Sequence, residues 1–395
     1  MSLNETAPVV GPVALRDRAL TPDLARGLML ALIAVANSVY YLYGRPYGVR
    51  QHIVEHDLLN RVVSVVDVTL VDGRAYPMFA ALFAFGVVQS FRRQRAAGVP
   101  EVDAKRLLRR RSRWLIAFGF AHAVLLFPGD ILGLYGVLGF LLIALTRVSD
   151  RALLVAAALW LVVGAAVQGA AQMMPPTGER TFFWSFETAD ALTALALRPL
   201  EWLLIPVGNL AIGSAVLIGT WAARRGVLTD PASHRALLVR TAVGGLVAAV
   251  VGGLPVGLAV GGFWEPTSTG ALWTTSALHA LTGIAGGLGY AALIGLLALR
   301  VGDRPGPVAR ALAACGQRSL SCYLFQSVVF VALLTPWALG LGRTLGTAEV
   351  GLLALGTWLV SVLLADRLRR ANRRGPAEVL LRRLVYRGRQ GRMSG

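Results

Sequence analysis

Residues 241–262 read TAVGGLVAAVVGGLPVGLAVGG, a stretch of 22 residues without a charged side chain. An α-helix rises about 1.5 Å per residue, so about 20 mainly apolar residues are needed to cross roughly 30 Å of bilayer hydrocarbon. Further stretches of this kind cover residues 23–43, 75–91, 112–128, 131–147, 151–171, 201–222, 275–299, 319–337 and 347–366. The sequence therefore predicts an all-α, polytopic integral membrane helix bundle with about ten transmembrane helices.

The composition supports this class. Apolar residues make up 55% of the 395 residues and charged residues only 15%, whereas soluble domains contain roughly 45–50% and about 25%. This balance excludes a disordered chain, a small disulfide scaffold and an ordinary cytosolic enzyme. The net charge of +18 is typical of a protein that binds nucleic acid, but the sequence between the apolar spans contains no folded basic module that could do so. We expect the lipid bilayer, and no nucleic acid, as a partner.

The basic residues predict the orientation. Residues 92–113 contain nine Arg and Lys residues, and ten arginines follow Asp366. Because bases gather in cytoplasmic loops, both termini are predicted to be cytoplasmic in a multi-pass protein of the plasma (inner) membrane. The domain prediction is a cytoplasmic segment 1–22 without a cleavable signal peptide, a membrane domain 23–366 and a basic cytoplasmic tail 367–395. An exception is the first outer loop, which carries Arg45, Arg50, Arg61 and Arg74.

Several features are left open or read as structural. Residues 60–71 alternate polar and apolar types around Asp67, which fits a span, a re-entrant segment or an interfacial helix. Cys315 and Cys322 have no His or acidic cluster beside them and are interpreted as free thiols. His52 and His56 lack an adjacent third ligand, so no metal is predicted. The sequence does not predict the oligomeric state.

Polar residues inside the first span form one group of candidates. Asp23 and Arg26 stand three residues apart on one helical face, and Asn37 lies four turns further on. Buried ionisable groups cost about 2.5 kcal/mol or more in a membrane. One interpretation is an interfacial ion pair with Asn37 hydrogen bonded between helices, and the other is a polar stripe that faces a substrate cavity. Gln326, in the ninth span, is a further candidate for that cavity.

The third span carries the strongest candidates. His122 follows Arg111 by eleven residues, which is about 16 Å along the axis and three turns to within about 20°, so both side chains point the same way. A desolvated neutral imidazole can accept a proton, and Asp130 in the following turn would orient the ring. The alternative is a buried histidine hydrogen bonded between helices. On the outer side, Glu201 and His279 are candidates for an acceptor site, near tryptophans that are typical of a membrane interface.

Short ordered motifs along nearly the whole chain resemble a known family. They are DLARG at 23–27, MFAALFAFG at 78–86, RRRSRWLIAFGFAH at 109–122, GDILGLY at 129–135, GQRSLSCYLFQS at 316–327 and GPAEVLLRRL at 375–384. This set is similar to the YeiB-like family, domain of unknown function 418. One departure is at Ala377 and Val379, where the family usually carries Leu and Trp.

The resemblance implies a distant relation to transmembrane acyltransferases, in which an Arg and a membrane-embedded His are a recurrent pair. On this hypothesis Arg109, Arg111 and Arg113 bind the phosphates of a cytoplasmic acyl-CoA, since clustered arginines suit phosphate. His122 acts as the base or acyl carrier toward an acceptor at the outer face, Asp130 fixes its tautomer, and Asp23, Arg26, Asn37 and Gln326 line the cavity. Two alternatives stay open: a small-solute transporter with proton coupling through His122 and Asp130, and a structural or sensory membrane protein.

Overall fold

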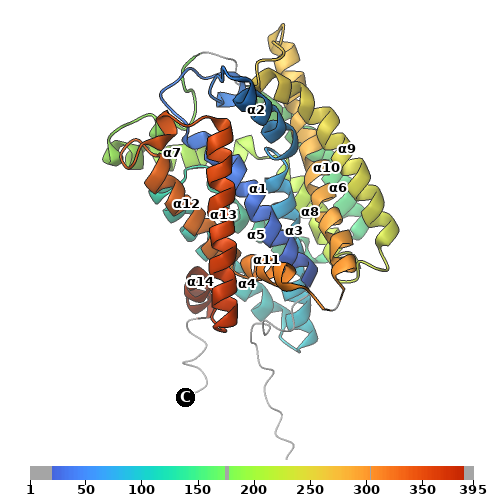
Figure 1. Cartoon of the computed structure of the whole chain (residues 1–395). Coiled ribbons are helices and arrows are strands. Elements are labelled where there is room, and N and C mark those ends of the chain that lie inside the picture. The colour runs from blue at the N-terminus through green and yellow to red at the C-terminus, as the bar shows by residue number, and fades with distance from the viewer. Residues whose placement is uncertain (1–19, 174–177, 303, 387–395) are drawn as a thin grey trace, which may run out of the picture.

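The computed structural model describes residues 20–173, 178–302 and 304–386, and its regular secondary structure in these ranges consists of helices joined by loops (Figure 1). Extended backbone is limited there to isolated bridges from Tyr47 to Ile53 and to Gly178. The N-terminal and C-terminal segments of the domain prediction lie partly outside these ranges. The all-α class predicted from the sequence is confirmed.

The α-helices are α1 (Leu20–Ser38), α2 (Leu58–Leu70), α3 (Ala75–Ala96), α4 (Glu101–Leu125), α5 (Leu132–Ala144), α6 (Asp150–Gln172), α7 (Ala191–Gly208), α8 (Ile212–Arg225), α9 (Arg235–Val260), α10 (Thr269–Val301), α11 (Pro307–Gln317), α12 (Ser319–Leu334), α13 (Thr347–Arg370) and α14 (Pro376–Tyr386). Short 3₁₀ turns are η2 (Val39–Tyr41), η3 (Val49–Gln51), η4 (Leu145–Arg147), η5 (Trp184–Phe186) and η6 (Leu341–Arg343).

In the described ranges, seven helical segments are long and apolar enough to cross a membrane, or eight if the bent pair α11–α12 forms one span. The other two predicted spans, 112–128 and 131–147, form a helical hairpin made by α4 and α5. The first half of α4 carries the arginine belt, which leaves too short an apolar half, and α5 with η4 covers only Leu132–Arg147. The structure therefore establishes a multi-pass helical bundle, with a smaller number of membrane-length helices than the ten predicted.

Two further boundaries differ from the prediction. The predicted span 201–222 is broken, because α7 ends at Gly208 and α8 begins at Ile212; the Asn209 side chain donates a hydrogen bond back to the Ile205 carbonyl. Residues 60–71 form most of α2, which continues into α3 as one candidate span from Leu58 to Ala96. α2 buries Asn60, Ser64 and Asp67 and exposes Leu58, Leu59, Val62 and Val66, so its polar face points into the protein.

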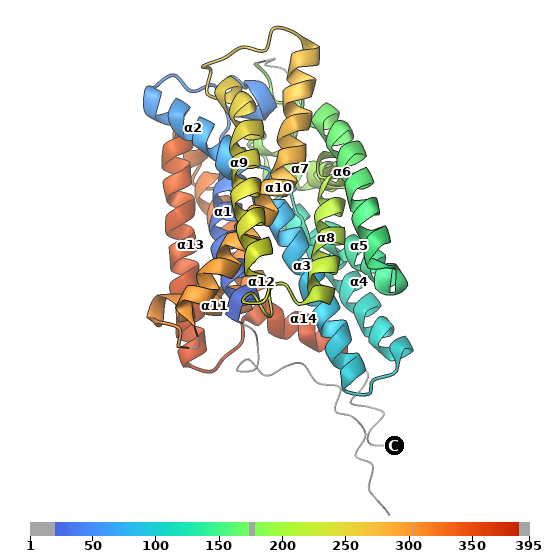
Figure 2. The ribbon, with the colours of Figure 1, turned by 90° about the vertical axis from the view of Figure 1, so that its right-hand side faces the viewer.

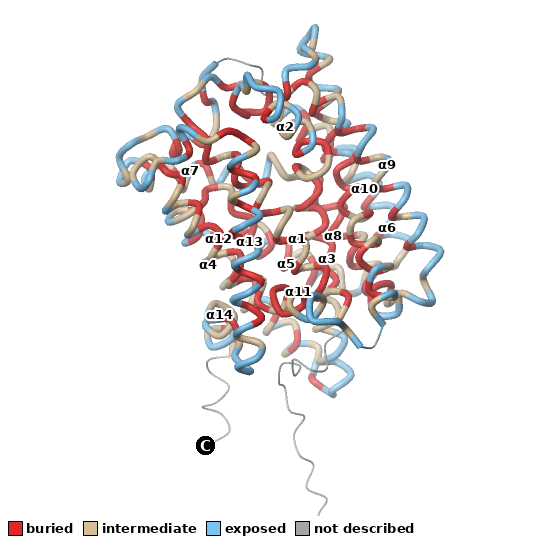
Figure 3. The backbone as a smooth tube through the Cα atoms, viewed as in Figure 1, coloured by how far each residue is buried: buried red, intermediate tan, exposed pale blue. Residues whose placement is uncertain are grey.

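Apolar side chains cover the outside of the bundle, as expected for contact with lipid. The exposed large residues include Val243, Val247 and Val251 on α9 and Leu352 and Leu359 on α13. Figure 3 shows the buried residues concentrated on α1, α3 and α8, with the exposed faces of the outer helices turned outward. A helix whose exposed face is apolar can place that face against the hydrocarbon chains of the lipid.

Figure 2 shows that the start of α1, the turn between α3 and α4, and α14 lie at the same end of the bundle. We call this the basic end, because most of the arginines of residues 92–113 and of the tail belong to it. The loops 42–57, 178–190 and 261–268 lie at the other end, which we call the loop end. That the basic end faces the cytoplasm remains a prediction.

A close crossing of α1 and α11 fixes the position of the first helix. A Cβ atom at Gly27 would lie 2.0 Å from the Leu312 carbonyl oxygen, and one at Gly316 would lie 1.8 Å from the Asp23 carbonyl oxygen. These backbones touch only because neither glycine has a side chain. After this crossing the chain bends by 83° between α11 and α12, which brings the first turn of α12 beside Asp23.

The four arginines of the first outer loop, which do not fit the predicted orientation, make contacts within the protein. Arg45 bonds the Leu345 carbonyl, and Arg61 donates to the carbonyl oxygens of Gly261 and Gly262 at 2.8 and 2.7 Å. Arg50 and Arg74 are buried, at 6% and 0% exposure, among polar side chains at the loop end. Since these side chains are used in internal contacts, they carry little information about orientation.

Acid is expected to destabilise the loop end through His52. Burial, the largest cause, and the nearby Arg50 lower the pKa of His52 to about 4, while Asp72 acts in the opposite direction. In the unfolded chain the pKa is about 6.5, so between pH 6.5 and 4 the unfolded state binds a proton that the folded state does not. Stability is therefore present above pH 6.5 and is lost as the pH falls to 4, by up to about 3 kcal/mol.

Thermal unfolding in detergent across this pH range would measure the loss. His52→Gln is expected to flatten the profile, whereas His56→Gln is the control, because that side chain is exposed in the native protein. A profile unchanged by His52→Gln would contradict the assignment.

Candidate functional site

Three buried side chains are hydrogen bonded to one another beside the turn between α4 and α5. We call them the relay: His122 on α4, Asp130 in the turn and Ser327 on α12. His122 Nδ1 lies 2.9 Å from Asp130 Oδ1, and His122 Nε2 lies 2.9 Å from Ser327 Oγ on α12. Asp130 Oδ2 accepts a hydrogen bond of 2.8 Å from the Gly133 backbone N–H. A Cβ at Gly119, one turn before His122, would lie 2.2 Å from the Gly133 nitrogen. Glycine at this position therefore lets the turn fold back onto α4.

This geometry favours one tautomer of the imidazole. A carboxylate can only accept a hydrogen bond, so Nδ1 carries the proton toward Asp130 and Nε2 is left as the acceptor. The Ser327 hydroxyl can then donate its proton either to Nε2 at 2.9 Å or to the Tyr323 carbonyl oxygen at 3.3 Å. The order carboxylate, imidazole, hydroxyl is the one used in general-base and nucleophilic catalysis. Ser327 was missed by the sequence reasoning; the signal was the polar pair Gln326 and Ser327 within an apolar helix.

A cavity of about 590 Å³ enters the bundle from the basic end, between α1, α3, α4, α12 and α14. Its charged lining residues are Asp23, Arg26, Arg93, Arg111, Arg374, Glu378 and Arg382. The deep end is lined by Leu30, Ile33, Phe79, Phe83, Leu115, Ile131, Leu132, Tyr135 and Tyr323. Asp23 and Ile33 are ten residues apart on α1, or about 15 Å along the axis. The cavity thus has a basic mouth and an apolar interior.

The mouth carries a surplus of positive charge. Five arginines and two carboxylates line it. Arg26 lies 3.5 Å from Asp23, and it also donates to the Leu82 carbonyl at 3.2 Å. The Arg111 guanidinium lies 5.9 Å from the centre of the Phe83 ring, where the charged part of the cavity meets its apolar part. Such a lining suits an amphiphilic anion.

Helix α14 closes part of the mouth. Glu378 Oε1 accepts hydrogen bonds from the Leu320 and Ser321 backbone N–H groups at 2.9 and 3.2 Å, and Oε2 accepts one from Ser321 Oγ at 2.5 Å. A carboxylate here satisfies the open donors of the α12 N-terminus and interacts favourably with the helix dipole. Leu381, Arg382 and Val385 continue the lining along α14.

The relay lies directly behind the deep end of the cavity. The Tyr323 ring, which lines the cavity, packs on His122 with ring centroids 4.7 Å apart. Ile131 and Leu132, which follow Asp130, also line it. His122 itself is buried and does not contribute to the lining. One aromatic side chain therefore separates the imidazole from the cavity.

On the loop-end side, the relay is covered by aromatic rings. Tyr41 lies against Phe127, Phe186 and Phe330 with ring centroids 5.6, 4.6 and 5.7 Å apart. All four side chains are at most 2% exposed. We call these four residues the aromatic layer. Phe330 is three residues beyond Ser327 on α12, so the layer follows immediately above the relay.

The other residues predicted to bind CoA phosphates are not with Arg111. Arg109 is exposed and lines a separate surface cavity of about 390 Å³ with Lys105 and Arg147, and Arg113 is exposed outside both cavities. Residues two positions apart on a helix point about 200° apart. Of these three arginines, only Arg111 therefore lines the main cavity.

Two predicted cavity residues are buried elsewhere in the bundle. Asn37 accepts a hydrogen bond of 2.7 Å from the Tyr76 hydroxyl, and neither residue lines the cavity. Gln326 is 1% exposed, and neither atom of its amide has a hydrogen-bond partner in the described ranges. Asn37 matches the interhelical hydrogen bond that was one of the two interpretations.

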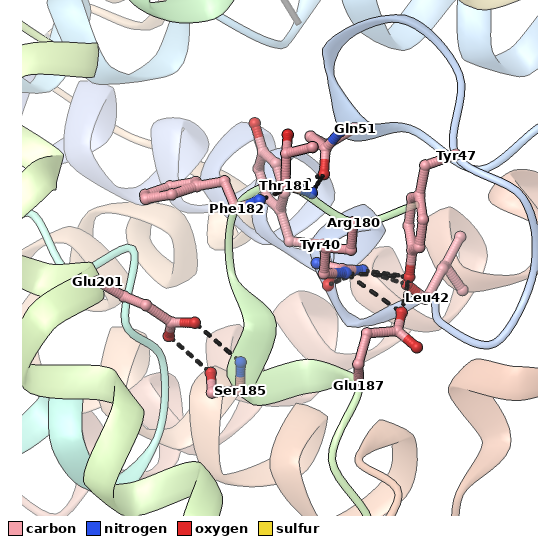
Figure 4. A network of polar contacts seen from close by, with 10 residues as sticks. All are labelled: Tyr40, Leu42, Tyr47, Gln51, Arg180, Thr181, Phe182, Ser185, Glu187 and Glu201. Carbon is pink, nitrogen blue, oxygen red and sulfur yellow. Dashed lines mark hydrogen bonds and ion pairs between the residues drawn. The ribbon is translucent and has the colours of Figure 1, made fainter. Parts of the chain in front are cut away.

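Glu201 holds the loop 178–190 in place rather than lining the cavity (Figure 4). Its carboxylate accepts hydrogen bonds from the Ser185 backbone N–H at 2.8 Å and from the Ser185 hydroxyl at 2.7 Å. In the same loop, Arg180 donates to the Leu42 carbonyl at 2.6 Å and to the Tyr47 hydroxyl at 2.8 Å. These contacts fasten the loop over the end of α1 and bring Phe186 into the aromatic layer.

His279 belongs to a second buried polar cluster, at the loop end. Arg74 Nη1 lies 2.9 Å from the His279 ring nitrogens, and His279 Nε2 lies 3.6 Å from Asp72 Oδ2. Arg50 pairs with Asp72 at 2.5 Å. Asp67 is also buried, and neither of its carboxylate oxygens has a hydrogen-bond partner among the described residues. The cluster places His279 with α2 and the start of α3, and His279 does not line the cavity.

The two carboxylates of this cluster are expected to respond differently to neutralisation. Asp72→Asn leaves the buried Arg50 guanidinium without its counter-ion and should lower the free energy of unfolding by about 3–5 kcal/mol. Asp67→Asn should change it little or raise it, because no ion pair or hydrogen bond to the Asp67 side chain is lost. Thermal unfolding of both variants in the same detergent compares them; equal losses would contradict this division of roles.

The fold and cavity define a multi-pass helical membrane protein with an internal cavity that has a basic mouth and an apolar interior. Residues 222–388 match the family described as protein of unknown function (DUF418), which confirms the resemblance predicted from the motifs over that part of the chain. The match covers α12 and α14, and so includes Tyr323, Ser327 and Glu378. The chain is also 26% identical, over 336 residues, to "Uncharacterized protein YxaH" of Bacillus subtilis (strain 168), with 78% of each chain covered.

Proposed function

We propose that the protein is a membrane-embedded acyltransferase that takes the acyl group of an acyl-CoA from the basic end and transfers it to an acceptor toward the loop end. The observation that carries the proposal is the cavity: its basic mouth suits the CoA phosphates, its apolar interior suits the acyl chain, and its deep end abuts the His122 relay. In this proposal the basic end faces the cytoplasm, where acyl-CoA is available, and the protein resides in the plasma membrane.

His122 serves as the general base. Its Nε2 takes the proton of the acceptor hydroxyl or amine as that group attacks the thioester carbonyl carbon, and Asp130 stabilises the imidazolium that forms. The carbon–sulfur bond then breaks, and the CoA sulfur receives the proton from Nε2. Ser327 occupies the position on Nε2 that the acceptor must reach, so its hydroxyl either moves aside or relays the proton.

Binding to the purified full-length protein tests the donor. We expect octanoyl-CoA to bind more tightly than either CoA or octanoate alone, because only the complete molecule uses both parts of the cavity. Binding should weaken with increasing salt, since charge–charge contacts at the partly solvated mouth are screened. Release of free CoA thiol from octanoyl-CoA in membranes that contain the protein reports turnover. If octanoyl-CoA binds no more tightly than octanoate, the proposal is contradicted. Gradient-driven solute flux without donor turnover would favour the small-solute transporter instead.

A further inference from the structure

Tyr323 lines the cavity, and its hydroxyl has no hydrogen-bond partner among the described residues. The hydroxyl is buried, the residue being 5% exposed. The hydroxyls of Tyr41, Tyr76 and Tyr135 all have one: they donate to the Leu126 carbonyl, the Asn37 side chain and the Tyr76 carbonyl. Buried hydroxyls in proteins are normally paired, so Tyr323 is the exception in this group.

The position of this hydroxyl indicates the kind of group it would bind. Tyr323 lines the deep, apolar end of the cavity, and its ring packs on His122. An apolar ligand would leave the hydroxyl unpaired. A ligand that carries an acceptor oxygen at this depth would pair it, and the acyl chain of the proposed donor carries one such oxygen near its reactive bond.

We propose that Tyr323 Oη–H binds the carbonyl oxygen of the donor's acyl group, beside His122. This inference rests on the proposed function. When the acceptor attacks the carbonyl carbon, the electron pair of the C=O bond moves onto that oxygen, and the Tyr323 hydroxyl stabilises the negative charge. When the carbon–sulfur bond breaks, the pair returns and the C=O bond is restored. Donors placed where charge develops in this way are typical of acyl transfer.

The experiment uses two CoA probes of equal chain length with the purified full-length protein. The ketone probe keeps the carbonyl but has a methylene between it and the sulfur, so it cannot transfer its acyl group; the thioether probe has no carbonyl. The wild-type protein should bind the ketone probe about fivefold more tightly, the value of one ordinary hydrogen bond. Tyr323→Phe keeps the ring against His122 and should bind both probes equally.

Tyr135→Phe is the matched control. Tyr135 lines the same cavity, but its hydroxyl already donates to the Tyr76 carbonyl at 3.0 Å. This variant should keep the preference for the ketone probe and lose thermal stability, whereas Tyr323→Phe should lose the preference and keep or gain stability. If Tyr323 only packs on His122, Tyr323→Phe should leave the probe preference unchanged, because the ring is kept.

The outcomes separate the two proposals. If the wild-type protein binds both probes equally, the role of Tyr323 is refuted while the donor site stands. If the Tyr323→Phe protein still prefers the ketone probe, the role of Tyr323 is likewise refuted while the donor site stands. If the wild-type protein binds neither probe, the proposed function fails, and the role of Tyr323 fails with it. A Tyr323→Phe protein that does not fold would show that the hydroxyl has a structural partner and would also overturn the inference.

Discussion

Replacing His122 by alanine is expected to lower the rate of acyl transfer by about 10²–10⁴-fold, the usual contribution of a positioned general base. The expected loss is in kcat, with little change in donor affinity, because His122 lies behind Tyr323 and does not line the cavity. The measurement is release of CoA thiol under saturating octanoyl-CoA, together with the dissociation constant of the donor. A loss of donor binding alone would contradict the role of His122 as the base.

The relay offers its own controls. Asp130→Asn keeps the size of the side chain but places an amide beside the His122 ring, and it should lower turnover by a smaller factor through the wrong tautomer. Ser327→Ala separates the two routes: a protein that still turns over uses direct proton transfer from the acceptor to His122, whereas complete loss with donor binding intact indicates that the Ser327 hydroxyl relays the proton. Thermal unfolding of each variant is needed beside the kinetics, since all three side chains are buried.

Arg111→Gln is expected to weaken the binding of octanoyl-CoA by about 10–100-fold, because a hydrogen bond from an arginine to a phosphate is charge-assisted and contributes roughly 1.5–3 kcal/mol. The effect should appear in affinity and not in kcat. The affinity should also depend less on salt than that of the wild-type protein, since one charge of the mouth has been removed.

The same helix provides matched controls for this prediction. Arg109→Gln and Arg113→Gln remove one charge from the same part of α4, but both side chains are exposed and neither lines the main cavity. They should change donor affinity less than twofold. If all three variants weaken binding equally, the arginine belt acts through its overall charge, and the cavity has no specific role for Arg111.

Much of the fold could be predicted from the sequence because membrane-length apolar helices are a property of local composition. The errors arose where local composition was not decisive. α2 is half polar, and its polar face is turned inward by packing against α9; α4 becomes apolar only after its arginine belt. The break between α7 and α8 depends on a hydrogen bond from Asn209, which no pattern of hydropathy reveals.

The candidate site could be predicted only in part. His122 and Asp130 are eight residues apart and meet across one turn, so their neighbourhood is visible in the sequence. Ser327 is 205 residues from His122, and a single sequence does not reveal such a contact. The helical periodicity that placed Arg111 and His122 on one face also separates Arg109 and Arg113 from them. The candidates Glu201 and His279 were predicted to lie at an outer acceptor site; in the structure they are buried and contact Ser185, Asp72 and Arg74.

The aromatic layer above the relay has a consequence for the permeability of the membrane. The cavity has a charged mouth and ends one aromatic side chain from the His122 imidazole, so a shorter barrier separates that imidazole from the other compartment. A potential of 100 mV drives each charge across with about 2.3 kcal/mol. The four packed rings of Tyr41, Phe127, Phe186 and Phe330 place a layer of buried hydrocarbon on the loop-end side of the imidazole. In the proposed function, in which the cavity admits a charged ligand, this layer would oppose the passage of protons past His122.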